Sequence, residues 1–370
     1  MKSAIKESAA LTTKARDKAT TTRAASVFQG EKSWHLIAAY LNMSNVSTSV
    51  NKTSAIIKSS PSNPAVIAEV LPIAVVIVLV NSLVFYLFLK QGKLRTPTNC
   101  LLLSLAVCDF MTGFIGIPLF IVVVVMHTVM PPAAVGHLSD FIIVFHNAMA
   151  ITAAYHILTI TVERYLSILK PFVHHQLTKK SMLRVVILVW FVSIVLSLLP
   201  YAWHSKTLSD LVSYKKTQFG YVVFCLIFVF LIPCIVIIVS QFFMFKAISQ
   251  SGRQCLSSQS ASRRRANNDK KCLIIFALMT TIYLACWLPW FVLSLYFTLW
   301  FPLSQQTLNA LYNMAQVFGI FRFVTSIVNP LLYTFFKRDF LTAFKLHILR
   351  RKPTRRDTTL VSQGKSLISS

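Results

Sequence analysis

The stretch Thr161-Val162-Glu163-Arg164-Tyr165 decides how the rest of this sequence is interpreted. It ends an apolar run that begins near Phe141, and residues 166–171 after it have the sequence LSILKP. A helix inside the hydrocarbon core does not readily carry adjacent Glu and Arg side chains unless they lie at the water boundary or have partners. Arg also suits the C-terminal end of a helix, where the helix dipole is negative. The pair therefore indicates either a helix that simply leaves the membrane or a functional pair of charges.

The composition is that of a helical membrane protein with several spans. Of the 370 residues, 55% are hydrophobic and 13% are charged, and the mean hydropathy is +0.64. A soluble domain carries about a quarter charged residues. The net charge of +26 is also typical of nucleic-acid-binding proteins, but the basic residues lie in loops and tails between apolar blocks. They are better explained as membrane-topology signals, so we expect no nucleic-acid partner.

Seven apolar blocks of spanning length occupy most of the chain. They lie at about 66–89, 99–127, 139–162, 183–203, 219–245, 272–300 and 307–335. At a rise of 1.5 Å per residue, each block is long enough to cross a hydrocarbon core of about 30 Å. We therefore predict an all-α membrane protein, a bundle of seven transmembrane helices spanning residues 65–335.

Basic residues alternate between the connections and predict the orientation. Every second connection is rich in bases: Lys90, Lys93 and Arg95, then Lys170, Lys179, Lys180 and Arg184, then Lys246, Arg253, Arg263, Arg264, Arg265, Lys270 and Lys271. The opposite connections hold only Lys206, Lys215 and Lys216. Because basic loops stay on the cytoplasmic side, we expect a multi-pass plasma-membrane protein with an extracellular N-terminus and a cytoplasmic C-terminus.

Residues 1–64 are predicted to form an extracellular, disordered tail. They are polar and basic and show no sustained hydrophobic periodicity. Three glycosylation sequons begin at Asn42, Asn45 and Asn51. Their clustering favours a lumenal or extracellular location for this tail.

The other end of the chain predicts a short helix followed by a tail. Residues 336–348 place apolar residues at helical spacing beside bases, which predicts an amphipathic eighth helix lying on the inner leaflet in contact with membrane lipids. Residues 349–370 are basic and contain Ser and Thr, so we expect a cytoplasmic tail that accepts phosphates.

The seven cysteines show no spacing that is typical of a metal site or of a disulfide framework. The sequence therefore predicts no metal and no cofactor. The last of these cysteines is Cys286, so palmitoylation of the predicted eighth helix is not expected.

Three polar side chains deep inside the apolar blocks are candidates for function. Asn81 lies in the first block, Asp109 in the second, and Asn329 precedes Pro330 in the seventh. Polar groups at membrane depth are costly and usually face the interior of a bundle. A structural network that joins helices by hydrogen bonds explains them as well, and such a network can also be a switch.

Seven short motifs, one on each successive block, resemble those of rhodopsin-like (class A) G-protein-coupled receptors. They are Asn81; Leu105-Ala106-Val107-Cys108-Asp109; Glu163-Arg164-Tyr165; Trp190; Pro233; Cys286-Trp287-Leu288-Pro289; and Asn329-Pro330-Leu331-Leu332-Tyr333. Each motif alone is weak evidence, but the ordered set covers about 66–348 and is specific for the family.

The resemblance implies a receptor, not an enzyme, with no catalytic residues of its own. It implies an extracellular ligand bound in the helical bundle, a heterotrimeric G protein on the cytoplasmic side, and arrestin and a receptor kinase at the C-terminal tail. Arg164 would be held inactive by Glu163 and by Asp269, which lies twenty residues before Pro289. Trp287 would respond to the ligand and Tyr333 would swing inward.

Several positions depart from the family pattern. Ser139 stands where a cysteine usually forms a disulfide, and residues 204–218 contain no cysteine, so that disulfide is not expected. His146 replaces the aspartate of monoamine receptors, and Phe323 replaces the lysine that binds retinal. Gln241 replaces a tyrosine that supports the active state. Ala153 replaces a serine that helps Asp109 hold sodium, although Ser326 remains.

Four residues are predicted to line the ligand pocket: His146, Asn147, Trp287 and Arg322. His146 is equally well explained as a hydrogen-bonded interior histidine. Arg322 in the outer half of a span needs an anion of a ligand, a structural partner, or a route to the membrane surface. Asn147, Thr152 and Tyr155 either line the pocket or pack. The ligand is not identified, although apolar upper helices favour a small or lipid-like molecule.

Two other functions compete with a signalling receptor. Ser139 and Gln241 motivate a non-signalling or constitutively active orphan protein on the same fold. A transporter is the remote alternative, and it predicts paired charges across several spans or an internal repeat, neither of which the sequence contains.

Overall fold

The computed structural model describes residues 63–130, 132–204, 211–254, 260–298 and 305–350. The sequons at Asn42, Asn45 and Asn51, and the predicted tail from 351 to 370, lie outside the described residues. Within the described ranges, seven helices are long and apolar enough to cross a membrane. The predicted seven-transmembrane bundle is therefore confirmed, and the chain is a multi-pass membrane protein.

The helices have the following bounds. The first span is α3 (Asn63–Lys90); the second is α4 (Pro97–Met111), the π-helical segment η3 (Thr112–Gly116) and α5 (Ile117–Val129); the third is α6 (Pro132–Leu169); the fourth is α8 (Lys179–Leu198); the fifth is α10 (Leu211–Phe224), the π-helical segment η5 (Cys225–Leu231) and α11 (Ile232–Gln254); the sixth is α12 (Ser260–Thr298); and the seventh is α13 (Gln305–Phe336). Shorter pieces are η2 (Gly92–Leu94), α7 (Pro171–His175), α9 (Tyr201–His204) and α14 (Arg338–His347).

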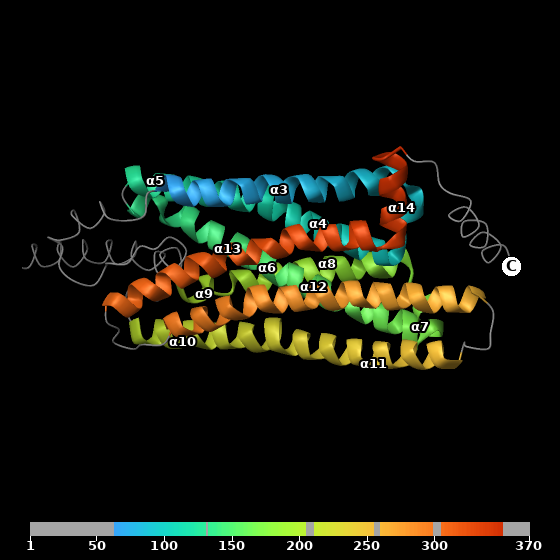
Figure 1. Cartoon of the computed structure of the whole chain (residues 1–370). Coiled ribbons are helices and arrows are strands. Elements are labelled where there is room, and N and C mark those ends of the chain that lie inside the picture. Colours follow the sequence, from blue (N-terminus) through green and yellow to red (C-terminus); the bar gives the residue numbers. More distant parts are fainter. Residues whose placement is uncertain (1–62, 131, 205–210, 255–259, 299–304, 351–370) are drawn as a thin grey trace, which may run out of the picture.

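The long helices lie side by side along one axis, with α14 turned across one end of the bundle (Figure 1). α12 packs between α11 and α13, and α6 contacts α4, α8 and α11. The end of the apolar run at 162 suggested that Glu163 and Arg164 lie in the last turn of the third helix. The helix instead continues to Leu169, so both residues lie within it. Similarly, α12 begins at Ser260, well before the apolar block at 272, because Arg, Lys and Ala favour helix as strongly as apolar residues do.

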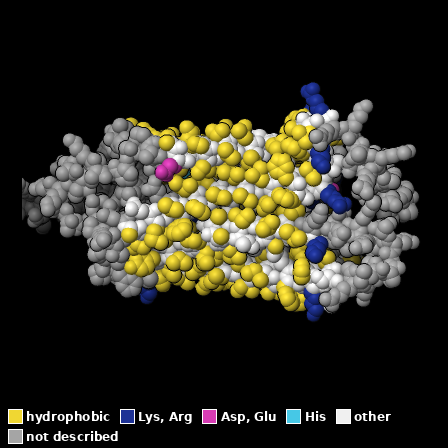
Figure 2. Space-filling model, in the orientation of Figure 1, with side chains coloured by type: hydrophobic (Ala, Val, Ile, Leu, Met, Phe, Trp, Pro, Cys, Tyr) yellow, Lys and Arg dark blue, Asp and Glu magenta, His cyan; other side chains and the backbone are white. Residues whose placement is uncertain are grey.

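The surface of the bundle is apolar around its middle (Figure 2). Large side chains such as Leu79, Phe191 and Phe242 are more than 60% exposed, although residues of this kind are usually buried in soluble proteins. Lys and Arg side chains gather towards the end of the bundle that carries α14 (Figure 2). An apolar band with basic residues at one edge is the surface that a lipid bilayer requires.

The two π-helical segments both end just before a proline. η3 precedes Pro118 and η5 precedes Pro233. A proline lacks the N–H that would bond to the carbonyl four residues earlier, and its ring crowds that carbonyl. Widening of the preceding turn accommodates the ring, as is typical of π-bulges. The prolines were visible in the sequence, but Pro289 and Pro330 lie inside helices that remain α-helical, so proline alone did not predict the wider turns.

Gly113 lets the second span approach the first closely. A Cβ at this position would lie 2.7 Å from Ile77 Cγ2 and 2.9 Å from Ile77 Cβ, and 3.2 Å from the Ala74 carbonyl oxygen. The side chain of Ile77 is completely buried and part of α3, so it has little room to move. By contrast, a Cβ at Gly220 in α10 would meet nothing within 4 Å.

Gly113→Ala is expected to destabilise the folded protein by about 1–3 kcal/mol, the usual cost of forcing a methyl group into a packed contact. Gly220→Ala is the matched control, and we expect it to be neutral or to stabilise α10 by about 0.5–1 kcal/mol. The measurement is the thermal unfolding midpoint of the purified protein in detergent. Equal midpoints for the two variants would show that the first and second spans are not in close contact at Gly113.

Candidate functional site

A buried carboxylate lies at the α14 end of the bundle. Glu163, in α6, is 3% exposed and accepts a hydrogen bond from the Thr98 hydroxyl of α4. His174 Nε2, in α7, lies 2.7 Å from Glu163 Oε1, and Arg164 Nε lies 3.0 Å from Glu163 Oε2. The pair with Arg164 has the distance of an ion pair but not the angle of a hydrogen bond. Three elements therefore supply polar groups to one carboxylate, and the sequence alone did not indicate Thr98 or His174.

Arg164 also faces the sixth span. Its guanidinium carbon lies 5.9 Å from the centre of the Phe276 ring in α12, which is within the range of a cation–π contact. Tyr165 packs against a small apolar cluster that includes Met244 of α11 and Leu273 of α12. The side chain of Asp269 lies outside the described part of α12, so its pairing with Arg164 stays a prediction.

A polar network joins the first, second and seventh spans. The Asn81 amide donates to the Ile77 carbonyl at 2.9 Å and to the Ser326 carbonyl at 3.1 Å. Asp109 is 2% exposed and interacts with the side chains of Ser326 and Asn329. Asn81, Asp109 and Ser326, which were predicted for the core, therefore lie together with Asn329, which was predicted as a switch residue, on α3, α4 and α13.

Tyr333 and Pro330 lie farther along the seventh span. Tyr333 is completely buried, and its ring centre lies 5.4 Å from that of Phe340 in α14. Lys337, between α13 and α14, donates a hydrogen bond to the Asn99 side chain of α4. The end of α13 and the start of α14 are therefore fixed against the second span.

A second polar network joins the second, third and fourth spans. Trp190 Nε1 donates to Ser104 Oγ at 3.1 Å, and His156 Nε2 lies 2.8 Å from the same oxygen. His156 Nδ1 lies 2.8 Å from the Thr152 carbonyl, which can only accept, so Nδ1 carries a proton. In the neutral imidazole Nε2 then accepts the Ser104 proton. Trp190 was predicted for the core, but nothing in the sequence indicated its partners, Ser104 and His156.

The described part of the bundle contains a cavity of about 170 Å³ towards the end away from α14. All four predicted pocket residues line it: His146 and Asn147 from α6, Trp287 from α12 and Arg322 from α13. Thr152 and Tyr155 do not line it. The hydroxyl of Tyr155 donates instead to the Phe228 carbonyl at 3.4 Å, because this side chain faces the fifth span.

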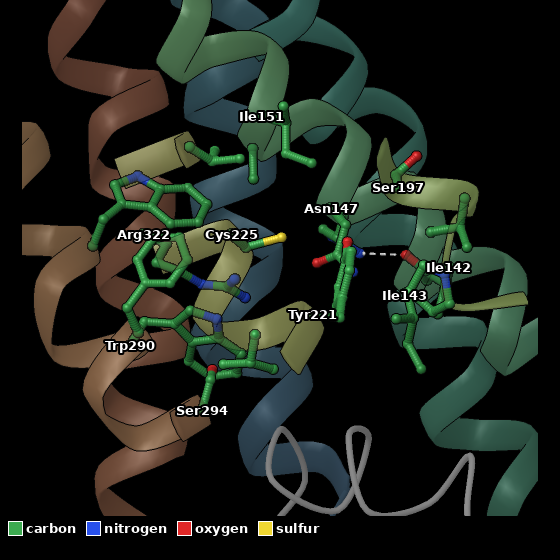
Figure 3. Close-up of a pocket in the computed structure, with 18 of the residues that line it drawn as sticks. Ile142, Ile143, Asn147, Ile151, Ser197, Tyr221, Cys225, Trp290, Ser294 and Arg322 are labelled. Carbon is green, nitrogen blue, oxygen red and sulfur yellow. Dashed lines mark hydrogen bonds between the residues drawn. The ribbon is translucent and has the colours of Figure 1, made fainter. Parts of the chain in front are cut away.

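Arg322 is a buried cation with an aromatic environment. Only 6% of the residue is exposed, so the side chain does not reach the membrane surface. Its guanidinium carbon lies 3.8 Å from the centre of the Trp290 ring and 5.1 Å from that of Trp287. Figure 3 shows the guanidinium extending towards the interior of the pocket beside Trp290, with Asn147 and Tyr221 on the opposite side. The sequence predicted the cation in the pocket but not the stacking on Trp290.

His146 combines the two roles that the sequence left open. Its Nδ1 donates to the Ile142 carbonyl of the same helix at 3.0 Å, and its ring centre lies 5.9 Å from that of Phe323. It also lines both the large cavity and a smaller one of about 30 Å³. His146 is therefore a hydrogen-bonded interior histidine that still faces the pocket.

The smaller cavity lies between the pocket and the Asp109 network. It is lined by Asp109 and Ser326, and it shares His146, Trp287 and Arg322 with the large cavity. Ala153 also lines it and offers no oxygen to a cation. The described residues contain no group of three or more His, Cys, Asp or Glu side chains that could hold a metal ion.

Comparison with known protein families identifies the family of this chain. Residues 80–333 match the model of the family described as "7 transmembrane receptor (rhodopsin family)". The chain belongs to this family. Its members are signalling receptors and not enzymes, as the sequence motifs implied.

Three curated relatives illustrate how distant the individual similarities are. The receptor is 28% identical to the human (Homo sapiens) neuromedin-U receptor 2 over 295 residues, which are 74% of this chain and 69% of that protein. It is 28% identical to the melanopsin of Podarcis siculus, over 68% of this chain and 55% of that protein. It is 24% identical to the pyroglutamylated RF-amide peptide receptor of Mus musculus, over 73% and 67% respectively.

Ser104→Ala is expected to destabilise the receptor by about 1–3 kcal/mol, because it leaves buried groups of His156 and Trp190 without a partner. Ser193→Ala is the matched control. The Ser193 hydroxyl is also buried, but it donates only to the Val189 carbonyl of its own helix. In Ser193→Ala that carbonyl still accepts its hydrogen bond from the helix backbone. Thermal unfolding of the purified variants measures the difference. If both serines tolerate alanine equally, the Ser104 network contributes nothing to stability.

Proposed function

We propose that this receptor binds an extracellular ligand in the 170 Å³ cavity and activates heterotrimeric G proteins at the opposite end of the bundle. The observation that carries the proposal is the Glu163 cluster. A buried carboxylate holds Arg164 beside α12 at one end, while an apolar cavity with a few polar groups occupies the other. A ligand site and a charged, restrained site on opposite ends of one bundle suit a protein that transmits a signal across a membrane.

The proposed orientation puts the pocket outside the cell and α14 inside. It is supported by the Lys and Arg side chains at the α14 end (Figure 2), because basic residues stay on the cytoplasmic side. In this orientation residues 1–64 are extracellular, and the sequons at Asn42, Asn45 and Asn51 are available for glycosylation. We further propose residues 65–335 as the receptor domain, 336–348 as a helix on the inner leaflet and 349–370 as a cytoplasmic tail that meets arrestin and a receptor kinase.

Activation requires that Arg164 be released from Glu163. The carboxylate is largely desolvated and is shared with Thr98 and His174, so separating the charges costs free energy that an active state must recover elsewhere. Such an element biases a two-state equilibrium, and a G protein that accepts the freed Arg164 shifts it. Asp269 would add a second restraint from the sixth span.

Trp287 is suited to connect the pocket with this restraint. Its ring lines the pocket and stacks at 5.8 Å on Tyr283, which in turn lies 5.9 Å from Phe230 of η5. A ligand that displaces Trp287 therefore pushes on aromatic rings that join α12 to the fifth span. Because Tyr333 packs on Phe340, we propose that its inward movement follows loosening of α14.

The size of the cavity limits what the ligand inserts. A volume of about 170 Å³ accommodates one side chain or a small molecule, whereas pockets for drug-sized ligands have volumes of roughly 300–1,000 Å³. One relative is named for neuromedin U and another for a pyroglutamylated RF-amide peptide, so a peptide that inserts its end is compatible with this cavity. Another is named melanopsin, but Phe323 stands here where opsins carry the retinal lysine, so we do not propose a photopigment.

A receptor with weak or no signalling is the second candidate, and one contact favours it. Gln241, which replaces the usual tyrosine, donates from Nε2 to Thr280 Oγ1 at 3.1 Å and ties α11 to α12. That bond holds the sixth span to the fifth, so a movement of the sixth span away from the fifth must break it. The intact Glu163–Arg164 pair favours the signalling receptor.

Arg164→Ala tests the proposed function directly. We expect guanine-nucleotide exchange, measured in cells without ligand and across a library of peptides and small molecules, to fall at least about tenfold, since 1.4 kcal/mol of lost interaction with the G protein is a factor of ten. Arg184→Ala is the control, because Arg184 is an exposed arginine of α8 outside the cluster. Surface expression must be equal. Signalling that persists in Arg164→Ala would contradict the proposal, and silence of the wild type throughout would favour the non-signalling candidate.

Glu163→Gln is expected to raise ligand-independent signalling by about fivefold, because losing ~1 kcal/mol of restraint on Arg164 changes a population by that factor. The amide still accepts a hydrogen bond from Thr98 but no longer pairs with a cation. Asp339→Asn is the control, since this acid is exposed on α14 at the same end of the bundle. Basal nucleotide exchange at matched expression is the readout. An unchanged or lower basal rate in Glu163→Gln would mean that the carboxylate does not restrain Arg164.

A further inference from the structure

We propose that the ligand of this receptor carries an anionic group of carboxylate type, and that this group binds the Arg322 guanidinium in the pocket. The proposal rests on the proposed ligand-binding role of the cavity and specifies the chemistry of the ligand. It is carried by the position of one buried cation in an otherwise mostly apolar wall.

The stacking of Arg322 fixes the plane of its guanidinium. The Trp290 ring lies 3.8 Å from the guanidinium carbon and the Trp287 ring lies 5.1 Å away. A cation–π contact uses the face of the guanidinium, whereas its five N–H donors lie in the plane. The donors at the edge can therefore bind acceptors in the cavity without losing the aromatic contacts. Their fork matches the two oxygens of a carboxylate.

The rest of the wall favours an anion with an apolar body. Ile143, Ile151, Val222 and Phe291 contribute apolar surface to the cavity, and Asn147 lies across from the guanidinium (Figure 3). In such an environment water screens a charge poorly, so a carboxylate gains more from Arg322 than it would at the surface. A guanidinium is also more weakly hydrated than an ammonium, which lowers the cost of keeping it in this wall.

The second charged residue of the described wall lies at a different depth. Asp140 is in α6, six residues before His146, and a rise of 1.5 Å per residue places it about 9 Å farther towards the end of the helix. It lies near Tyr201, another residue of the wall. An anion beside Arg322 is therefore well separated from the Asp140 carboxylate. An amine bound to Asp140 is the competing interpretation.

Arg322 also connects the proposed anion with the Asp109 network. It lines the small cavity together with Asp109, and Trp287 lines both cavities. An anion in the pocket attracts the guanidinium of Arg322 from the side of the large cavity. Asp109 lies on the side of the smaller cavity, which both residues line. Binding of the anion thus changes the electric field at Asp109 and the contact between Arg322 and Trp287, which gives the ligand a direct effect on the core.

The test uses three probes of nearly the same shape and different charge: 4-phenylbutyrate, 4-phenylbutyramide and 4-phenylbutylamine. Binding is measured on the full-length receptor in lipid nanodiscs, without a G protein, by saturation-transfer NMR titration. We expect the carboxylate to bind at least about tenfold more tightly than the amide, as charge-assisted bonds require. Arg322→Gln should lower the affinity for the carboxylate to that for the amide, and Arg322→Lys should retain part of the ratio. Asp140→Asn should not reduce it.

Three outcomes would overturn the proposal. In the first, the wild type binds all three probes with equal affinity. In the second, it binds the amine most tightly and Asp140→Asn removes that preference. In the third, no probe binds at millimolar concentration. Retained amide binding shows that each variant is folded with an open pocket. Binding is measured without a G protein, so it is independent of signalling. If the receptor prefers the carboxylate through Arg322 but never signals in cells, the result supports this inference and contradicts the proposed signalling function.

Discussion

The burial of polar side chains in a protein surrounded by hydrocarbon is the constraint on which the rest of this structure depends. The outward surface is apolar, so polar groups must find partners between the helices. Among the described residues, three clusters of such partners surround Glu163, Ser104 and Asp109, and single contacts such as that of Gln241 with Thr280 add to them. Apolar side chains fill the remaining space, but leucine against leucine offers no advantage over leucine against lipid. The polar contacts therefore select which helices are neighbours.

All three polar clusters include α4. Thr98 binds Glu163, Ser104 binds His156 and Trp190, and Asp109 binds Ser326 and Asn329. From Thr98 to Asp109 the helix rises about 16 Å, roughly half of the hydrocarbon core. One helix thus connects the Arg164 end of the bundle with the small cavity below the pocket. A displacement of α4 changes all three clusters at once, whereas α6 and α13 each contact only some of them.

The sequence predicted the number of spans, because long apolar blocks separated by bases have few alternative explanations. It also predicted that Asp109 faces the interior, since a carboxylate is costly in lipid, but for Arg322 it left a route to the membrane surface open. It could not predict their partners. Trp190 and Ser104 are 86 positions apart, and Glu163 meets Thr98 from 65 positions away. Such pairings depend on the packing of whole helices. The sequence did not predict that α12 begins as early as Ser260, because hydrophobicity does not distinguish a polar helix from a loop. It did not predict the π-helical turns either, because a helix can accommodate a proline with or without such a turn.

Arg322 illustrates how one buried cation can serve both recognition and coupling. Removing a guanidinium from water is costly, and two indole faces offset part of that cost. Both indoles belong to α12, whereas Arg322 belongs to α13, so the contact also holds the sixth span against the seventh. Any group that moves the guanidinium along its own plane alters its overlap with Trp287 and Trp290. If the proposed anion binds Arg322, the sixth span therefore senses it through the same side chain that recognises it, and no separate relay between ligand and helix is required.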